Sequence, residues 1–119
     1  MMSRIWNNMK EAIFHPKAKE LLRTFSKDVR QAIGQAILEL QKGNSLFLPL
    51  SKPMPTVGLG VEELRVKDSS NLYRIFYYKK CAKGILVFHA FVKKTQKTPV
   101  HEIKLGRSKL KEMLYEENK

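Results

Sequence analysis

Three strand-like runs in the second half of the chain, joined by short polar links, constrain the fold more than any other feature. The runs cover residues 61–67, 72–79 and 85–92, and they are rich in β-branched and aromatic side chains. The links, 68–71 and 80–84, are short enough for hairpins. The sequence therefore predicts three consecutive antiparallel strands.

The first half of the chain predicts a short strand followed by two helices. Residues 12–14 suit a strand, and Pro16 suits the start of a helix because its missing N–H is not needed there. Apolar residues recur at three- and four-residue steps through 17–25 and again through 29–40, as they do on the buried face of a helix. Ser26 is the expected N-cap of the second helix.

Glycine and proline mark the remaining boundaries. Gly43 is expected to end the second helix, whereas Gly34 inside it indicates close packing against a neighbour. Residues 43–60 hold three prolines and three glycines, and predict a long connection whose apolar residues pack against the protein. A final helix is predicted over 99–117.

This order of elements predicts an α+β fold, in which helices cover one face of a mostly antiparallel sheet. With 119 residues the chain is expected to form one domain, 1–119, and its 43% apolar content supports a core. Residues 1–10 read as a leader without the apolar stretch of a signal peptide.

Positive charge is concentrated between Arg65 and Lys97. This window holds nine Lys or Arg and one acid, a net +8 of the chain's +12. Its densest part, 93–98, places three lysines and two threonines where the third strand ends. Such cations repel one another unless an anion lies among them, and a phosphate backbone is the natural candidate. The simpler alternative is a solvated basic surface.

Other site classes find little support in the sequence. Cys81 is the single cysteine, so no internal disulfide is expected and a reducing compartment suits the chain. Three scattered histidines give no metal-ligand spacing, and we expect neither a metal nor another cofactor. No run approaches the ~20 apolar residues that cross a bilayer. We expect a cytoplasmic protein without a membrane partner.

The alternation of side chains along strands assigns the cations to one face of the sheet. In the middle strand Tyr73, Ile75 and Tyr77 share the core side. The opposite side, expected to be open, would show Arg65, Arg74, His89, Phe91 and Lys93, with Phe76 and Tyr78 between the cations. On such a face an arginine contributes little to the core. Cations interleaved with rings suit single-stranded RNA, because charge holds phosphates and rings stack on bases.

Three segments resemble motifs of the phage-derived, HigB-like branch of the RelE/ParE superfamily of type II toxins. They are Glu63-Leu64-Arg65, Tyr73-Arg74-Ile75-Phe76-Tyr77 and Phe91-Val92-Lys93-Lys94-Thr95-Gln96-Lys97-Thr98-Pro99. The similarity covers residues 13–115 in the right order and leaves the leader, 1–10, outside it. The resemblance implies a small RelE-like fold, with two N-terminal helices on one face of the sheet and a C-terminal helix.

The resemblance also implies an activity and partners. Toxins of this kind are metal-independent endoribonucleases that cleave translated mRNA on the ribosome, and are called mRNA interferases. The substrate's own 2′-OH attacks the adjacent phosphate and leaves a 2′,3′-cyclic phosphate and a 5′-OH. The implied partners are the ribosome and mRNA, a cognate antitoxin with a helix-turn-helix, and DNA bound by the toxin–antitoxin complex.

The family's functional residues map onto cations of this chain. Arg65, Arg74, Lys93 and Lys94 are the expected catalytic residues, because fixed guanidinium and ammonium groups stabilise the charge that builds on the phosphorane. We expect Arg74 to contact the scissile phosphate and Arg65 the same or the next one. The residues expected to bind RNA are Lys67, Phe76, Phe91, Thr95 and Lys97, with Phe91 stacking on a base.

The proton carrier and the activity itself stay open at this level. Lys93 or Lys94, crowded by like charge, loses a proton more readily than an isolated lysine and suits a general base or acid. His89 is the other candidate, although a lone strand histidine is more often structural. Two other functions fit the same residues: a ParE-like gyrase inhibitor, and a non-catalytic nucleic-acid-binding module.

Overall fold

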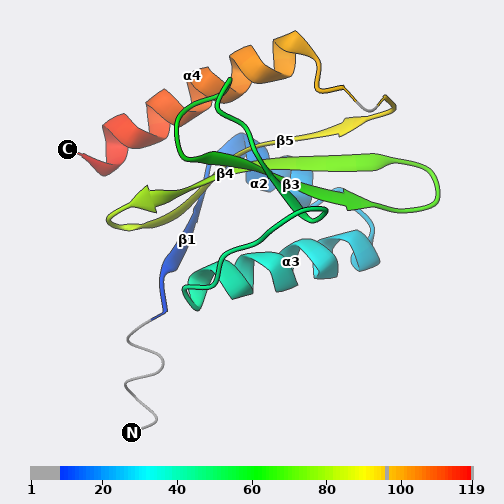
Figure 1. Cartoon of the computed structure of the whole chain (residues 1–119), viewed down its shortest axis with the longest axis horizontal. Coiled ribbons are helices and arrows are strands. Elements are labelled where there is room, and N and C mark those ends of the chain that lie inside the picture. The colour runs from blue at the N-terminus through cyan, green and yellow to red at the C-terminus, as the bar shows by residue number, and fades with distance from the viewer. Residues whose placement is uncertain (1–8, 96, 119) are drawn as a thin grey trace, which may run out of the picture.

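The computed structural model describes residues 9–95 and 97–118, and this part of the chain contains five strands and three helices (Figure 1). In chain order they are β1 Glu11–Phe14, α2 Pro16–Leu22, α3 Lys27–Gln41, β2 Ser51–Pro53, β3 Val61–Lys67, β4 Leu72–Cys81, β5 Gly84–Lys93 and α4 Val100–Glu117. Residues 1–8 of the leader and Gln96 of the lysine-rich segment lie outside the described residues. The predicted α+β class is confirmed, and the arrangement is consistent with a RelE-like fold.

The described strands form one sheet in the order β1-β5-β4-β3-β2. The predicted run of antiparallel strands is confirmed, since β4 pairs antiparallel with both β3 and β5. β1 lies parallel to β5 at one edge, and the long connection that a parallel pair requires runs through α2, α3 and the other three strands. β2, which the sequence analysis did not predict, forms the other edge. Pro53 is tolerated there because an edge strand has one unpaired side.

The two N-terminal helices begin where their capping residues predict. Pro16 opens α2, and the ring of His15 accepts a hydrogen bond from the backbone N–H of Lys17. Ser26 caps α3 as predicted, because its Oγ accepts from the N–H of Val29 at 3.3 Å. α2 ends at Leu22, one turn earlier than the apolar spacing suggests.

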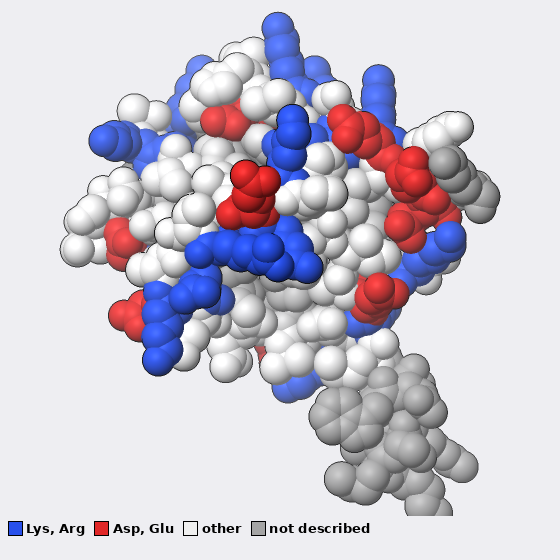
Figure 2. Space-filling model, turned by 180° about the vertical axis from the view of Figure 1, so that it is seen from behind, with Lys and Arg blue, Asp and Glu red and all other residues white. Residues whose placement is uncertain are grey.

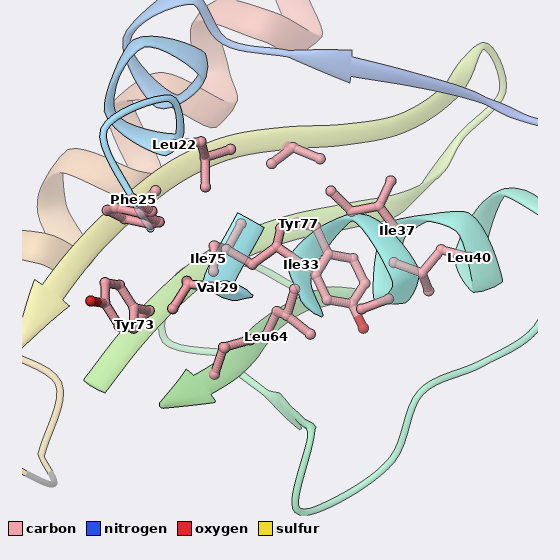
Figure 3. Close-up of a cluster of buried hydrophobic side chains, with 14 of the residues drawn as sticks. Leu22, Phe25, Val29, Ile33, Ile37, Leu40, Leu64, Tyr73, Ile75 and Tyr77 are labelled. Carbon is pink, nitrogen blue, oxygen red and sulfur yellow. The ribbon is translucent and has the colours of Figure 1, made fainter. Parts of the chain in front are cut away.

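The first core cluster lies between these helices and one face of the sheet (Figure 3). Its helical side is the buried stripe of α3, and the sheet contributes the side chains predicted to face the core, among them Tyr73, Ile75 and Tyr77. The ring of Phe25 lies against that of Tyr73, with centroids 4.7 Å apart. This half of the alternation prediction is confirmed.

Gly34 does not have the role that the sequence suggested. It lies in the middle of α3 on the exposed side, and no atom lies within 4 Å of the position that a Cβ would occupy. The predicted close packing at this glycine is therefore wrong within this chain.

α4 and the segment between β2 and β3, which contains Met54 and Val57, cover much of the sheet face that was predicted to be open. The second core cluster on this face contains Met54, Val57, Val61, Phe76, Leu86, Phe88, Phe91, Leu110 and Met113. α4 approaches closely because Gly106 faces the ring of Phe76, where a Cβ would lie only 2.8 Å from a ring carbon. The sheet thus has helices on both faces, and the prediction of an open face is wrong.

A β-bulge changes the alternation along β5. Phe76 pairs with His89 and Tyr77 with Val87, so Phe88 is the extra residue. Leu86 and Phe88 consequently join the cluster under α4, although strict alternation from Phe91 places them on the opposite face, with Ala90. The prediction for this part of β5 is wrong because one inserted residue reverses the phase of every residue beyond it.

The long connection between α3 and β3 is packed in one part and exposed in another. Leu46 packs against the first core cluster, and Met54 and Val57 belong to the second. Phe47, Leu48 and Leu50, by contrast, are 74%, 64% and 37% exposed, so the prediction that the apolar residues of this segment are packed is wrong for these three. The loop lies beside the end of β3, because the N–H of Arg65 donates to the carbonyl of Leu50 at 2.8 Å.

None of the helices within the described residues combines the length and the apolar character that spanning a bilayer requires.

Candidate active site

Arg65, Arg74 and Lys93 come from three neighbouring strands and meet at one end of the sheet. Arg65 and Arg74 are direct partners in the register between β3 and β4. Arg74 is opposite Phe91 on β5, and Lys93 lies two residues further along on the same face. In Figure 1 this end of the sheet is where β5 runs into the loop before α4. The convergence expected from the sequence is thus present.

Glu63 lies among these cations, and the sequence analysis did not select it. Its carboxylate is buried, with Oε1 at 3.5 Å from Nε of Arg74 and 3.9 Å from Nε of Arg65. Its other oxygen accepts a 2.9 Å hydrogen bond from the hydroxyl of Thr98. The signal was available, because Glu63 precedes Arg65 by two residues on the same strand face, but it lies just outside the basic window. We call Glu63, Arg65, Arg74 and Lys93 the cationic cluster.

The two guanidinium groups of the cluster keep unused hydrogen-bonding capacity. Nε of Arg65 and Nε of Arg74 are buried and have no hydrogen-bond acceptor among the described residues, although both lie within ion-pair distance of Glu63. Arg74 is only 3% exposed, and its Nη1 donates to the carbonyl of Tyr73. Two buried donors without an acceptor are the kind of group that an entering anion can satisfy.

Lys93 lies inside this cluster and not on the surface. It is 4% exposed, and its Nζ donates to the hydroxyl of Thr98 at 3.4 Å. Burial is the main cause that lowers the pKa of Lys93, and the charge of Arg74 lowers it further. The charge of Lys52 also lowers the pKa of Lys93. Lys52 lies on β2 opposite Glu63, and therefore close to the cluster. A lysine whose pKa is lowered in this way releases its proton more readily than a free lysine.

The remaining predicted cations surround the cluster. Lys67 is exposed at the end of β3, and Lys94, Thr95 and Lys97 are exposed in the loop before α4. The hydroxyl of Thr95 donates to the carbonyl of Lys97 at 3.3 Å, a contact within the loop itself.

A groove of about 400 Å³ opens beside the cluster. Its lining residues are Pro49, Leu50, Arg65, Val66, Lys67, Leu72 and Arg74. The groove gives an external anion a route to both arginines, and it places the exposed apolar loop that contains Leu50 at its border.

The two aromatic rings predicted to stack on RNA are buried. Phe76 is 0% and Phe91 4% exposed, and their rings pack edge to face with centroids 5.4 Å apart. Both belong to the cluster under α4. The predicted exposure of these rings is wrong because α4 covers this part of the sheet, and in this arrangement neither ring is accessible to a base.

His89 lies under α4 and not in the cationic cluster. It is four residues from Lys93 along β5, about 13 Å at the usual rise of a strand. Nε2 of His89 is 2.7 Å from a carboxylate oxygen of Glu102, and Nδ1 is 2.8 Å from Nζ of Lys109. The lysine donates, so Nδ1 accepts and the proton of the neutral ring is on Nε2. With both nitrogens bonded to α4, His89 holds that helix on the sheet.

The described residues include no group of three His, Cys, Asp or Glu side chains arranged like metal ligands.

Comparison with known families adds one finding. The model of the family described as phage-derived protein Gp49-like (DUF891) matches residues 20–111, which include every member of the cationic cluster. No curated protein matches the chain significantly.

Proposed function

This chain belongs to the Gp49-like family of phage-derived, toxin-like proteins, and from that membership we propose that it is the toxin of a type II toxin–antitoxin system, an mRNA interferase of the HigB-like kind within the RelE/ParE superfamily. The observation that carries the proposal is the cationic cluster, in which two arginines with unsatisfied buried donors and a lysine of lowered pKa meet beside a groove.

The chemistry proceeds by attack of an RNA 2′-OH on the adjacent phosphorus. A base takes the proton of the 2′-OH, the P–O5′ bond breaks, and an acid protonates the departing 5′ oxygen. The products are a 2′,3′-cyclic phosphate and a 5′-OH. Guanidinium groups of Arg65 and Arg74 hold the scissile phosphate and stabilise the negative charge that builds on it, and their effect is larger in a water-poor site.

Lys93 carries the proton in this proposal, because its lowered pKa brings the neutral amine closer to the working pH. Lys67, Lys94, Thr95 and Lys97 bind neighbouring phosphates from the exposed border. Glu63 is a positioning residue: it holds the cations together until the phosphate takes over the free donors of the two arginines.

Burial of the cluster favours catalysis over simple binding. Placing Arg74 and Glu63 out of water costs desolvation energy, and a module that only held phosphates would keep its cations exposed. Preorganised charges in a partly dry site, in contrast, are what stabilisation of a transition state requires.

Purified ribosomes programmed with a defined mRNA test the proposal. The wild-type protein should cleave the message and leave 2′,3′-cyclic phosphate ends, and it should leave DNA intact because DNA lacks the 2′-OH. Arg65→Ala should lower the single-turnover rate by about 100- to 1,000-fold, the usual effect of removing one such donor. Arg65 is the best position because it is partly exposed.

Lys104→Ala, on the exposed side of α4, is the matched control and should cleave like the wild type. Intact message together with blocked DNA supercoiling would instead make the protein a gyrase inhibitor. Binding of nucleic acid without either effect would make it a binding module.

The proposal includes a cellular setting. The protein acts in the cytoplasm, where translating ribosomes are its target, and a cognate antitoxin encoded beside it keeps it inactive. The antitoxin carries the helix-turn-helix through which the complex binds DNA.

A further inference from the structure

A second groove lies between α2, α3 and β1, at the opposite edge of the sheet from β2. It measures about 220 Å³ and shares no lining residue with the groove beside the cationic cluster. Its floor is formed by Phe14, Leu22, Ile33 and Ile37, and its rim by Lys19, Arg23, Arg30 and Gly34. We call it the helical groove.

The rim of the helical groove is positively charged and has no internal counter-charge. Lys19, Arg23 and Arg30 are exposed, and none of the three has an ion-pair partner within the described parts of the chain. Three cations around an apolar floor complement a ligand that has apolar side chains flanked by carboxylates.

Gly34 on the rim supplies an independent argument. A glycine in the middle of a helix costs about 1 kcal/mol relative to alanine, and the open space around Gly34 shows that this chain has no packing need for it. A missing side chain on a helix surface lets another backbone approach closely. A partner seated in the helical groove accounts for the glycine.

We propose that the helical groove binds an amphipathic helix of a protein partner, with its apolar side chains on the floor and its Asp or Glu side chains at the three rim cations. A groove bounded by two helices suits a helix better than an extended chain. A second copy of this chain is a poor occupant, because a two-fold contact would bring like-charged rims together. The inference rests on the proposed function in one respect, namely that the partner is the antitoxin.

A steric test uses the protein encoded by the adjacent gene as the probe, with binding measured by calorimetry. Gly34→Gln adds a side chain at the rim and should weaken binding by about tenfold or more. Its melting temperature should not fall, because glutamine is a better helix former than glycine. Ser108→Gln places the same side chain on the exposed side of α4 and should bind like the wild type.

An electrostatic test reverses the rim. Lys19→Glu, Arg23→Glu and Arg30→Glu combined should weaken binding on the order of 100-fold. The control reverses three exposed lysines elsewhere, Lys83→Glu, Lys104→Glu and Lys111→Glu, so that the change in net charge is the same. A site-specific contact requires the rim triple variant to lose much more affinity than the control.

Other results overturn the inference. Equal binding by wild type and both groove variants would mean that the antitoxin sits elsewhere, while mRNA cleavage, measured separately, leaves the proposed nuclease standing. Weaker ribosome association of the rim variant with unchanged partner binding would make this an RNA surface. A wild-type dimer that Gly34→Gln converts to a monomer would make a second copy the occupant. If the protein encoded by the adjacent gene does not bind the wild type, it is not the partner, and the inference is wrong.

Discussion

Arg74 is buried inside the protein, whereas the sequence predicted that it lies on an open face of the sheet. Its guanidinium is buried against Glu63, and burial lowers the pKa of Arg74 while Glu63 opposes that shift. A buried ion pair adds little net stability, but removing one partner leaves the other charge uncompensated. The site is therefore coupled to the stability of the fold.

We expect Arg74→Ala to abolish cleavage and also to destabilise the protein, by about 3 kcal/mol, because Glu63 then stays buried with fewer cations around it. Urea unfolding measures the loss. The control is Arg74→Ala combined with Glu63→Gln, which removes the buried negative charge and should recover part of the stability. Wild-type stability of Arg74→Ala would contradict the coupling.

The sequence predicted that Arg65, Arg74 and Lys93 meet, but it did not predict the carboxylate between them. Period two and the register of a hairpin place Arg65 opposite Arg74, so their meeting follows from local rules. Glu63 accepts a hydrogen bond from Thr98, which follows β5 and lies 35 residues further along the chain. Such an interaction between distant segments leaves no periodic trace in the sequence.

At the scale of elements, caps and apolar spacing predicted α2, α3 and the three central strands, because these signals are local. β2 escaped prediction because three residues cannot show alternation. The bulge at Phe88 was not predicted because an inserted residue has no signature of its own in the apolar stretch 85–88. The position of α4 on the sheet was not predicted, because it depends on which face α2 and α3 leave uncovered once they have packed.

Two glycines in helices provide a matched stability test. Gly34→Ala should stabilise the protein by about 1 kcal/mol, because the new methyl group meets open space and alanine favours helix. Gly106→Ala should destabilise it, because its Cβ would lie 2.8 Å from the ring of Phe76. Thermal unfolding of both variants measures the contrast. Equal shifts would mean that helix propensity alone decides both positions.

The attachment of α4 should depend on pH. Burial is the main cause that lowers the pKa of His89 from its ordinary 6.5, although Glu102 opposes the shift and Lys109 and His15 add to it. The unfolded chain then binds a proton before the folded one does. The stability contributed by neutral His89 is complete above pH 6.5 and is lost as the pH falls through its lowered pKa.

Melting temperatures between pH 7 and pH 5 test this expectation. The wild type should lose more stability over this range than His89→Gln, which cannot take up the proton. His101→Gln is the control, because His101 contacts the same Glu102 but is largely exposed. The melting temperature of this variant should fall with pH as that of the wild type does. A slope for His89→Gln equal to that of the wild type would exclude His89 as the source.

At the scale of the whole molecule, the net charge of +12 is not confined to the cationic cluster. Figure 2 shows basic side chains spread over the face seen from behind, with acidic ones between them. The sequence places a net +8 of this charge between Arg65 and Lys97, but exposed basic side chains also lie outside that stretch, among them Lys19, Arg23 and Arg30 on the rim of the helical groove. The proposed attraction to RNA would therefore also involve basic side chains outside the cluster, whereas the proposed cleavage belongs to the cluster alone.

Association with ribosomes should therefore weaken steeply with salt, because each neutralised phosphate releases counterions. Replacing Lys94 and Lys97 by Gln should reduce the slope of log K against log salt by about 0.7 for each phosphate that the variant no longer neutralises. Filter binding at several KCl concentrations measures the slope. An unchanged slope would mean that the loop before α4 does not bind phosphates.

The pairing of β1 with β5 joins residues 11–14 to residues 84–87, so the first strand finds its neighbour only after most of the chain has been synthesised. Pairings between such distant segments form late in folding. Before residue 84 is made, α3 already has β3 and β4 to pack against, whereas β1 lacks the strand with which it pairs. The cationic cluster draws on the same late strand through Lys93, so a product truncated before residue 84 should lack both the partner of its first strand and a complete cluster.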